Sequence, residues 1–292
     1  MLQILIAGLT VGFVYALVAM SFAPSYASSK VVNFGQGEIV MVGTVLGAVL
    51  VGQQGLPYFA ALPVIVVVTA VIDGLMYLVV IKTLRSRGAP LINMVIGTLT
   101  AGMVVAVAVA FLFGLDPRSF PSPFGSRPIQ VLGAFVGTQV LVVLVGVAVV
   151  LLVVWLLYER SRVGLAVRAT SEQRDTSRLV GINVETLTLG TFLVSGALAG
   201  LAGFLYGPLA NADPTSGFQF ALWGFTALIV GGLGSWIGPV VAGVALGVLD
   251  KVMDYWFGDG YSTTVVLAIL LLFLYVRPQG LMGRVESQGA AA

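Results

Sequence analysis

The 292-residue chain contains no cysteine and no histidine. These absences exclude disulfide bonds, thiolate nucleophiles, imidazole bases and metal sites built from cysteine and histidine. Lysine is scarce as well, because only Lys30, Lys82 and Lys251 occur, and no GxxxxGK[ST] stretch is present to cradle a nucleotide. We therefore expect no catalytic residues, no metal site and no cofactor on this chain.

Charge is also rare, since 9% of the residues are charged, compared with roughly 25% in an ordinary soluble domain. Hydrophobic residues make up 59% of the chain, and the mean hydropathy is +1.06. The net charge of +2 gives no basic surface for nucleic acid. The composition predicts an all-α polytopic protein embedded in a lipid bilayer.

Apolar segments bounded by glycine, proline or charge predict eight or nine hydrophobic helices. Segment 2–22 is longer than the core of a signal peptide and has no basic residues before it, so we expect it to be retained as the first span. Because a crossing helix needs about 20 residues, three of the segments are short. The segments are 2–22, 38–53 (short), 58–81, 90–114, 131–157, 187–207, 219–234 (short), 238–257 and 262–276 (short).

The chain is expected to form one transmembrane domain over residues 1–292. The stretch 115–130 carries four prolines, which predicts an external loop between an N-terminal half, about 1–115, and a C-terminal half, about 131–280. The second half contains a polar connection at 159–186.

The chain has 26 charged residues, of which 14 are basic and 12 are acidic. Nine of them lie in this connection, between Glu159 and Glu185. Charges are costly inside lipid, so this stretch must face water. Thr170 followed three residues later by Gln173 resembles a capping box, and Gly181 is a typical residue after a helix end. The pattern predicts a short helix between these positions, lying across the membrane surface.

The distribution of basic residues predicts the orientation. If the end carrying Lys82 is cytoplasmic and nine segments alternate, eleven of the 14 basic residues, including Arg284, fall on the cytoplasmic side. Arg118, Arg127 and Lys251 then lie outside. The N-terminus would be external and the C-terminus cytoplasmic.

Glycines have two expected roles. Small residues three or four apart at Gly8 and Gly12, between Gly196 and Gly207, and at Gly243 and Gly247 predict close helix packing. The stretches NFGQGE and IVGGLGSWIGP interrupt helices near the membrane, which is typical either of a transport route or of tight turns.

Asp73 is an acid within an apolar segment. It either contributes to the route or has a structural role, in which it is protonated, hydrogen-bonded to a neighbouring helix or placed at a subunit interface. The candidate residues of the translocation path are Asn33, Gln36, Glu38, Asp73, Gly231, Gly232 and Ser235.

Four stretches carry a family resemblance, and they occur in order along most of the chain: GLTVGFVYALVAMSF, VVNFGQGEIVMVGT, RATSEQRDTSRLVGIN and FTALIVGGLGSWIGPVVAGVALGVLD. They resemble bacterial ABC importer permeases for branched-chain and other hydrophobic amino acids, the LivH/LivM family, and more closely its LivH-type subunit.

The resemblance implies a multi-pass protein of the bacterial inner membrane. Its implied partners are a second homologous permease, two cytoplasmic ATPase subunits that hold ATP and Mg²⁺, and an external solute-binding protein. It also implies a coupling helix that contacts an ATPase, although the acidic-Ala-Ala triplet of the wider pattern is absent. The residues expected in this contact are Arg168, Ala169, Ser171, Glu172, Arg174, Asp175, Arg178, Gly181 and Ile182.

The expected function is ATP-driven import of branched-chain or other hydrophobic amino acids. Two alternatives stay open. A permease of the same family could carry urea or short amides, and an ion-coupled secondary transporter would need an acid such as Asp73 or Glu38 to titrate or to bind Na⁺.

Overall fold

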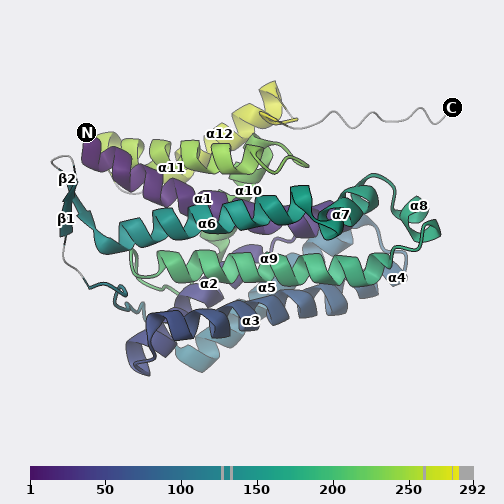
Figure 1. Cartoon of the computed structure of the whole chain (residues 1–292), viewed down its shortest axis with the longest axis horizontal. Helices are drawn as coiled ribbons and strands as arrows, with labels where there is room; N and C mark the ends of the chain where they lie inside the picture. The colour runs from purple at the N-terminus through teal and green to yellow at the C-terminus, as the bar shows by residue number, and fades with distance from the viewer. Residues whose placement is uncertain (126–127, 132–133, 259–260, 278, 283–292) are drawn as a thin grey trace.

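The computed structural model describes residues 1–125, 128–131, 134–258, 261–277 and 279–282, so Arg127 and Arg284 lie outside the described residues. The described chain is a bundle of helices that lie along one long axis (Figure 1). The elements are α1 (Leu2–Ser29), α2 (Gln36–Gly47) continued by the π-helix η1 (Ala48–Gln53), α3 (Tyr58–Met76) continued by the π-helix η2 (Tyr77–Lys82) and α4 (Thr83–Ser86), α5 (Leu91–Phe113), β1 (Pro128–Val131), β2 (Ala134–Gly137), α6 (Thr138–Arg160), α7 (Arg162–Glu172), α8 (Arg174–Leu179), α9 (Val184–Tyr206), α10 (Gly217–Gly231), α11 (Gly238–Phe257) and α12 (Ser262–Val276).

The predicted all-α polytopic fold is confirmed. Six helical stretches, beginning at residues 2, 36, 58, 91, 138 and 184, are long and apolar enough to cross a membrane. α11 has 20 residues but carries three charged ones, and α10 and α12 have 15 residues each. Each of the nine apolar segments of the sequence is therefore helical over most of its length.

Two predicted boundaries are wrong. The segment predicted from residue 131 becomes helical only at Thr138, because Gly137 precedes the helix and β2 pairs with β1 in a short antiparallel hairpin. The first helix continues to Ser29, well beyond residue 22. Its polar last turns are buried, and their serine hydroxyls are satisfied within the helix, since Ser25 donates to the Phe22 carbonyl oxygen and Ser29 donates to that of Ser25.

Within the described residues, the nine helical segments alternate in direction between the two ends of the bundle. Figure 1 places α4, α7 and α8 at one end, and the N-terminus with the β1–β2 hairpin at the other. We call the first of these the basic end, because it carries Lys30, Lys82, Arg85, Arg87 and the five arginines between residues 160 and 178.

Close helix contacts are made at the predicted glycines. A Cβ atom added to Gly12 of α1 would lie 2.7 Å from the Val244 carbonyl oxygen of α11, and one added to Gly200 of α9 would lie 2.1 Å from Thr69 Oγ1 of α3. The packing role predicted for the small residues is therefore confirmed. α1 lies at the centre, against α9, α10 and α11.

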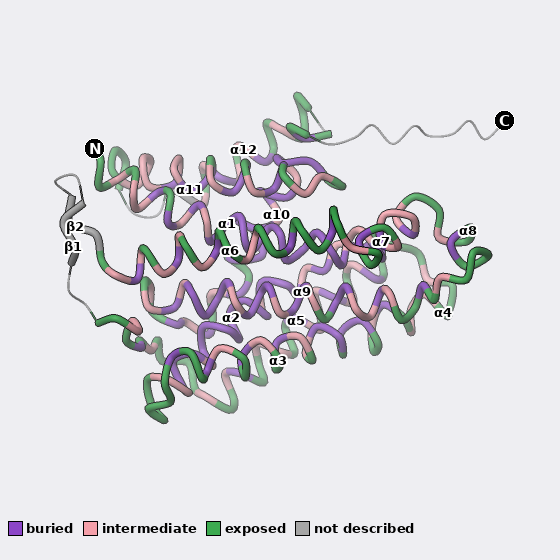
Figure 2. Tube along the Cα trace, in the orientation of Figure 1, coloured by how far each residue is buried: buried purple, intermediate pink, exposed green. Residues whose placement is uncertain are grey.

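Burial is uneven around the bundle. Figure 2 shows long buried stretches in α1, α2 and α9, and mainly exposed stretches in α6. In an 18-residue apolar stretch of each helix, only 17% of the residues are buried in α5 and in α6, compared with 61% in α1. The outer faces of α5 and α6 are therefore available to lipid or to another protein chain.

Candidate functional site

The polar connection between α6 and α9 forms two short helices at the basic end. α7 begins where Ser161 Oγ accepts a hydrogen bond from the Gly164 backbone N–H at 3.1 Å. The predicted helix start at Thr170 is wrong, because Ser161 already provides the cap and Thr170 is buried near the end of α7. The predicted end is confirmed, since α8 stops at Leu179 and Gly181 adopts the left-handed conformation, with φ 86°.

Most residues expected to contact an ATPase lie on the accessible surface of these helices, which we call the coupling surface. The Asp175 side chain is 96% exposed and that of Arg178 is 53% exposed. Glu172 and Gly181 are also exposed, while Ala169, Ser171 and Ile182 are half-buried.

The most exposed apolar residues of the coupling surface are Leu179, at 88%, and Val180, at 72%. Neither was assigned a contact from the sequence. An apolar pair beside a helix-ending glycine in a polar stretch is the signal that could have identified them, because adjacent exposed apolar side chains, unlike a single one, can form part of a protein contact.

Asp175 and Arg178 pair with each other at 3.6 Å, and two more of the expected contact residues bind elsewhere in the chain. Arg168 pairs with Glu159 at 2.9 Å. Arg174 Nη1 donates to the Ser28 carbonyl oxygen at 3.0 Å, and Arg85 Nη2 donates to the Ser29 carbonyl oxygen at 2.5 Å. Burial lowers the pKa of Arg174 from its ordinary value, with nearby Arg178 contributing in the same direction. The carbonyl groups at the C-terminal end of α1 lack helical partners, so α8 and α4 both attach to α1 here.

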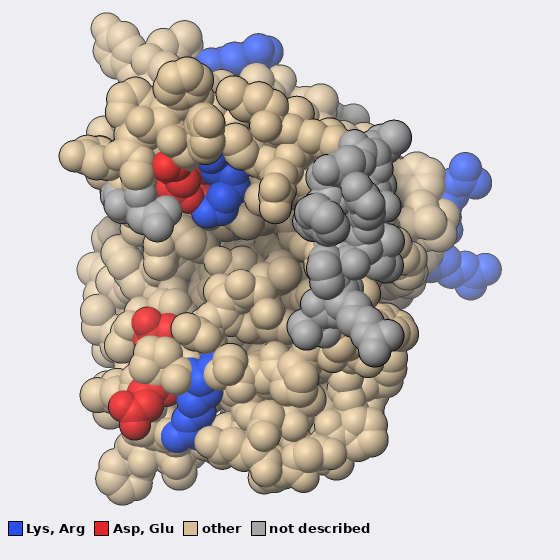
Figure 3. All heavy atoms as spheres, turned by 90° about the vertical axis from the view of Figure 1, so that its left-hand side faces the viewer, with Lys and Arg blue, Asp and Glu red and all other residues tan. Residues whose placement is uncertain are grey.

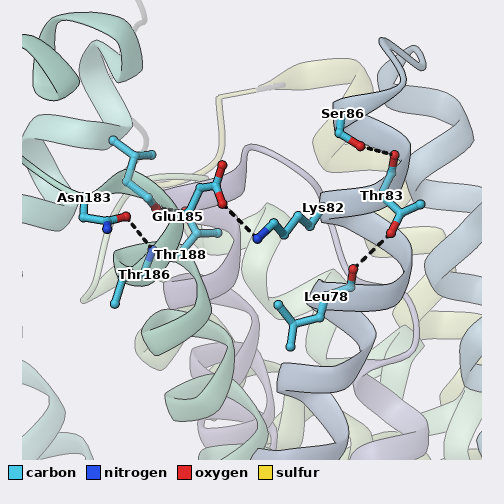
Figure 4. A network of polar contacts seen from close by, with 9 residues as sticks. Leu78, Lys82, Thr83, Ser86, Asn183, Glu185, Thr186 and Thr188 are labelled. Carbon is cyan, nitrogen blue, oxygen red and sulfur yellow. Dashed lines mark hydrogen bonds and ion pairs between the residues drawn. The ribbon is translucent and has the colours of Figure 1, made fainter.

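A third connection joins α9 to the end of the α3–η2–α4 helix. Lys82 Nζ lies 2.9 Å from Glu185 Oε2, and Figure 4 shows the two side chains pointing toward one another between the helices. The start of α9 is capped by Asn183, whose Oδ1 accepts from the Thr186 backbone N–H. α1, α4, α8 and α9 thus form one connected layer at the basic end.

Deeper in the bundle, three of the predicted path residues form a polar junction with Ser195. Asn33 Nδ2 donates to Asp73 Oδ1 at 2.8 Å and to Gln36 Oε1 at 3.2 Å, and Gln36 Nε2 donates to the Ser195 carbonyl oxygen at 2.9 Å. Asn33, Gln36 and Asp73 are at most 1% exposed. Asp73 is therefore bonded across the bundle, as one of its two interpretations predicted.

The polar junction lies well inside the bundle. Ser195 is about 16 Å along α9 from its first residue, at about 1.5 Å per residue. α2 begins at this depth with Gln36, so the connection from Lys30 to Gly35 returns into the bundle without helical structure. Non-helical backbone at membrane depth is tolerated only where protein or a water-filled path surrounds it.

Glu38, in the first turn of α2, is half-buried and faces two other helices. A Cβ atom added to Gly217 at the start of α10 would lie 1.8 Å from Glu38 Oε2, and one added to Gly102 of α5 would lie 3.3 Å from Glu38 Cγ. Glycine at both positions makes room for this carboxylate. Glu38 is therefore the only partly accessible acid among the predicted path residues.

Gly231, Gly232 and Ser235 lie elsewhere, at the end of α10 and in the turn that follows it. Ser235 Oγ accepts from the Gly238 backbone N–H at 3.0 Å, and Gly232 has φ 106°. Trp236 in this turn stacks on Tyr158 at the end of α6, with ring centroids 3.9 Å apart. The turn is at the far end of α10 from Gly217, about 21 Å along the helix axis, so the structure separates these residues from Glu38.

The end opposite the basic end has a mixed charge pattern. Figure 3 shows acidic side chains beside basic ones in two groups on this face. Lys251 pairs with Asp254 at 2.6 Å and with Asp250 at 3.4 Å. In the part of the chain that the structure describes, no three acidic side chains are grouped to hold a metal ion.

Comparisons with known proteins agree with this architecture. Residues 4–275 match the family model described as the permease component of branched-chain amino acid transport systems. BraD of Pseudomonas aeruginosa, named a high-affinity branched-chain amino acid transport system permease protein, is 30% identical, and the alignment covers 98% of this chain and 96% of BraD. LivH of Escherichia coli, which carries the same description, is 27% identical, with 98% and 96% covered.

A solved structure shares the fold. PsaBC from Streptococcus pneumoniae in complex with a Fab aligns with a TM-score of 0.51 at 13% identity, over 95% of this chain and 92% of that one. With the family match over nearly the whole chain, the resemblance inferred from the sequence is confirmed. The chain belongs to the branched-chain amino acid transport permease family of ABC importers, and it is a multi-pass protein of the inner membrane.

Proposed function

We propose that this chain translocates branched-chain amino acids, that a solute-binding protein delivers them at the external face, and that ATP hydrolysis on partner subunits drives the transport. The assembly would contain a second homologous permease and two cytoplasmic ATPase subunits with bound ATP and Mg²⁺. The relatives BraD and LivH are named for this class of substrate. The structural observation that carries the proposal is the coupling surface, which is open to a partner and attached to α1 through Arg174.

A series of hydrogen bonds suggests how a displacement of α8 is transmitted to the start of α2 inside the bundle. Displacement of α8 moves Arg174, and with it the Ser28 carbonyl group at the end of α1. One turn earlier, the Ser25 backbone N–H donates to Ser195 Oγ at 3.1 Å, and the Ser195 carbonyl group holds Gln36. The start of α2, including Glu38, therefore follows motion of α8 through a short series of hydrogen bonds.

Glu38 is the residue that we assign to substrate in this proposal. A branched-chain amino acid carries an ammonium group, a carboxylate and an apolar side chain. The Glu38 carboxylate can pair with the ammonium group, since it is partly accessible between α2, α5 and α10. Urea and short amides are neutral, so they could donate hydrogen bonds to this carboxylate but could not form the ion pair that an ammonium group forms.

Reconstitution tests the function directly. Proteoliposomes would contain this chain, its partner permease and the ATPase subunits, with the solute-binding protein outside and all ion gradients collapsed by ionophores. We expect uptake of radiolabelled leucine to require internal ATP and to persist without gradients. Isoleucine and valine should compete, whereas excess urea and acetamide should not. Uptake that stops when the gradients collapse would favour an ion-coupled transporter, and competition by urea would favour the amide alternative.

Glu38→Gln in the same system tests the substrate assignment. The amide preserves the size of the side chain but removes its charge, and a hydrogen bond to a charged group contributes about 1.5–3 kcal/mol. We expect leucine uptake to fall by about tenfold to a hundredfold, with ATP hydrolysis and assembly retained. Unchanged leucine uptake by this variant would remove Glu38 from the path.

A further inference from the structure

A groove opens at the basic end between α6, the start of α7 and α9. Its volume is about 490 Å³, within the range of roughly 300–1,000 Å³ typical of ligand sites. The lining includes Tyr158, Val163, Ile182, Thr186, Gly190 and Val194. Val163 is 63% exposed, and Thr186 is exposed as well, so the groove is open to the surroundings along one side.

The groove is polar at one end and apolar at the other. Asn183 and Thr186 line it at the first turn of α9. Toward Val194, about 16 Å further along α9, the α9 lining residues are Leu187, Gly190, Val194 and Thr191, whose hydroxyl is already bonded to the Thr188 carbonyl oxygen. A Cβ atom added to Gly190 would meet nothing within 4 Å, so this part of the groove is empty of protein atoms.

The polar end is positively charged. Arg160 and Arg162 are exposed and lie in the chain between the lining residues Tyr158 and Val163, and neither has an ion-pair partner within the described residues. The nearby acids are already neutralised, because Glu159 pairs with Arg168 and Glu185 pairs with Lys82. The N-termini of α7 and α9 border the same end and add to the positive potential.

We propose that this groove binds an anionic phospholipid from the leaflet at the basic end. The phosphate group would lie near Arg160 and Arg162, and one acyl chain would follow α9 past Gly190 toward Val194. Basic pockets between membrane helices favour anionic headgroups, and the groove combines that charge with an apolar channel of matching direction. Val163 of α7 lines the groove, so a bound lipid contacts one of the two helices that form the coupling surface.

Cysteine labelling tests the site, because the chain has no cysteine of its own. Thr186→Cys places one thiol at the polar end of the groove, at an exposed position whose own side chain makes no hydrogen bond in the described structure. The purified protein in neutral detergent would be treated with a maleimide in the presence of phosphatidylglycerol or phosphatidylcholine. We expect phosphatidylglycerol to slow labelling at least about fivefold more than phosphatidylcholine does.

Charge and volume variants in the Thr186→Cys protein provide matched controls. Arg160→Gln or Arg162→Gln should each raise the phosphatidylglycerol concentration for half protection about fivefold. Arg87→Gln, which removes an exposed arginine elsewhere at the same end, should not. Gly190→Leu should abolish protection by filling the groove, whereas Val107→Phe on the exposed face of α5 should leave it intact.

Three results would overturn the proposal: equal protection by both lipids, equal effects of the Arg160, Arg162 and Arg87 variants, or protection that appears only after ATPase subunits are added. Native mass spectrometry of the unmodified chain provides a second measurement that needs no variant. Retention of phosphatidylglycerol in preference to phosphatidylcholine is expected, and retention of neither contradicts the site.

Discussion

The Asp73 carboxyl group is fully buried, and only one of its oxygens has a hydrogen-bond partner in the described structure. Its neighbour Asn33 comes from the α1–α2 connection, so the bond holds the start of α2 against α3. A buried polar group that loses its partner costs about 1–3 kcal/mol. Asp73 therefore stabilises the fold chiefly by accepting the hydrogen bond from Asn33.

This reasoning predicts different outcomes for two substitutions of Asp73. Asp73→Asn keeps an acceptor for Asn33, so we expect a small change in melting temperature and at least half of the normal uptake. Asp73→Leu has a similar size but no acceptor, and should destabilise the protein by about 1–3 kcal/mol. Thermal unfolding and leucine uptake of both variants would be measured together. Loss of transport in a stable Asp73→Asn protein would show that the negative charge itself is needed.

At the residue scale, the sequence identified Asp73, Asn33 and Gln36 as unusual but could not show that they meet. Asn33 and Asp73 are 40 positions apart, and their contact depends on how α1, α3 and α9 pack. Arg174 was assigned to a contact with another protein, whereas its guanidinium group binds the end of α1. An arginine in a polar stretch gives no local sign of which acceptor it will find in the folded chain.

At the scale of elements, α8 combines an exposed apolar tip with an internal attachment. Leu179→Gln should weaken ATPase docking without affecting the fold, because this side chain is 88% exposed. We expect uptake to fall at least about fivefold, in line with the loss of roughly 1 kcal/mol or more from a buried interface residue. Co-purification of the ATPase subunits would be measured beside uptake. Leu56→Gln, at a 37% exposed position outside the coupling surface, is the control. Normal docking of the Leu179 variant would move the contact away from the tip of α8.

The contact between α1 and α11 allows a matched pair of glycine substitutions. Gly12→Ala would place a methyl group 2.7 Å from a backbone oxygen of α11, whereas Gly146→Ala in α6 would meet only Leu205 side-chain atoms, at 3.6 Å. Overpacking costs about 1–3 kcal/mol, so Gly12→Ala should lower the melting temperature by several degrees and Gly146→Ala should not. Equal melting temperatures of the two variants would show that α1 and α11 can separate at little cost.

Helix boundaries show what local sequence can and cannot predict. α11 has the predicted bounds of 238–257, since a glycine-proline pair begins it and Gly258 follows it. The hairpin before α6 and the polar last turns of α1 were missed because hydrophobicity alone does not distinguish a strand from a helix, or a serine-rich helix end from a loop. The sequence predicted close helix packing at four glycines, Gly8, Gly12, Gly243 and Gly247. It did not predict that the helices packed there would be α1 and α11.

For the whole molecule, the described helical segments alternate in direction, and this explains why most basic residues collect at one end of the bundle. The sequence predicted that Lys82, the arginines of the polar connection and the end of the first helix share one side of the membrane. In the structure they meet, since Arg85 and Arg174 both bind the end of α1 and Lys82 binds Glu185. Basic residues concentrate on the cytoplasmic side of membrane proteins, so we expect the basic end to face the cytoplasm.

Accessibility labelling of two single-cysteine variants tests this orientation. Ser86→Cys lies at the end of α4 and Ser119→Cys in the loop after α5; both positions are exposed, and they lie at opposite ends of the bundle. A maleimide that cannot cross the membrane should label Ser119→Cys in intact spheroplasts and Ser86→Cys only after lysis. Because the protein has no other cysteine, any signal comes from the introduced thiol. Labelling of Ser86→Cys in intact spheroplasts would put α7 and α8 outside the cell, where no cytoplasmic ATPase could reach them.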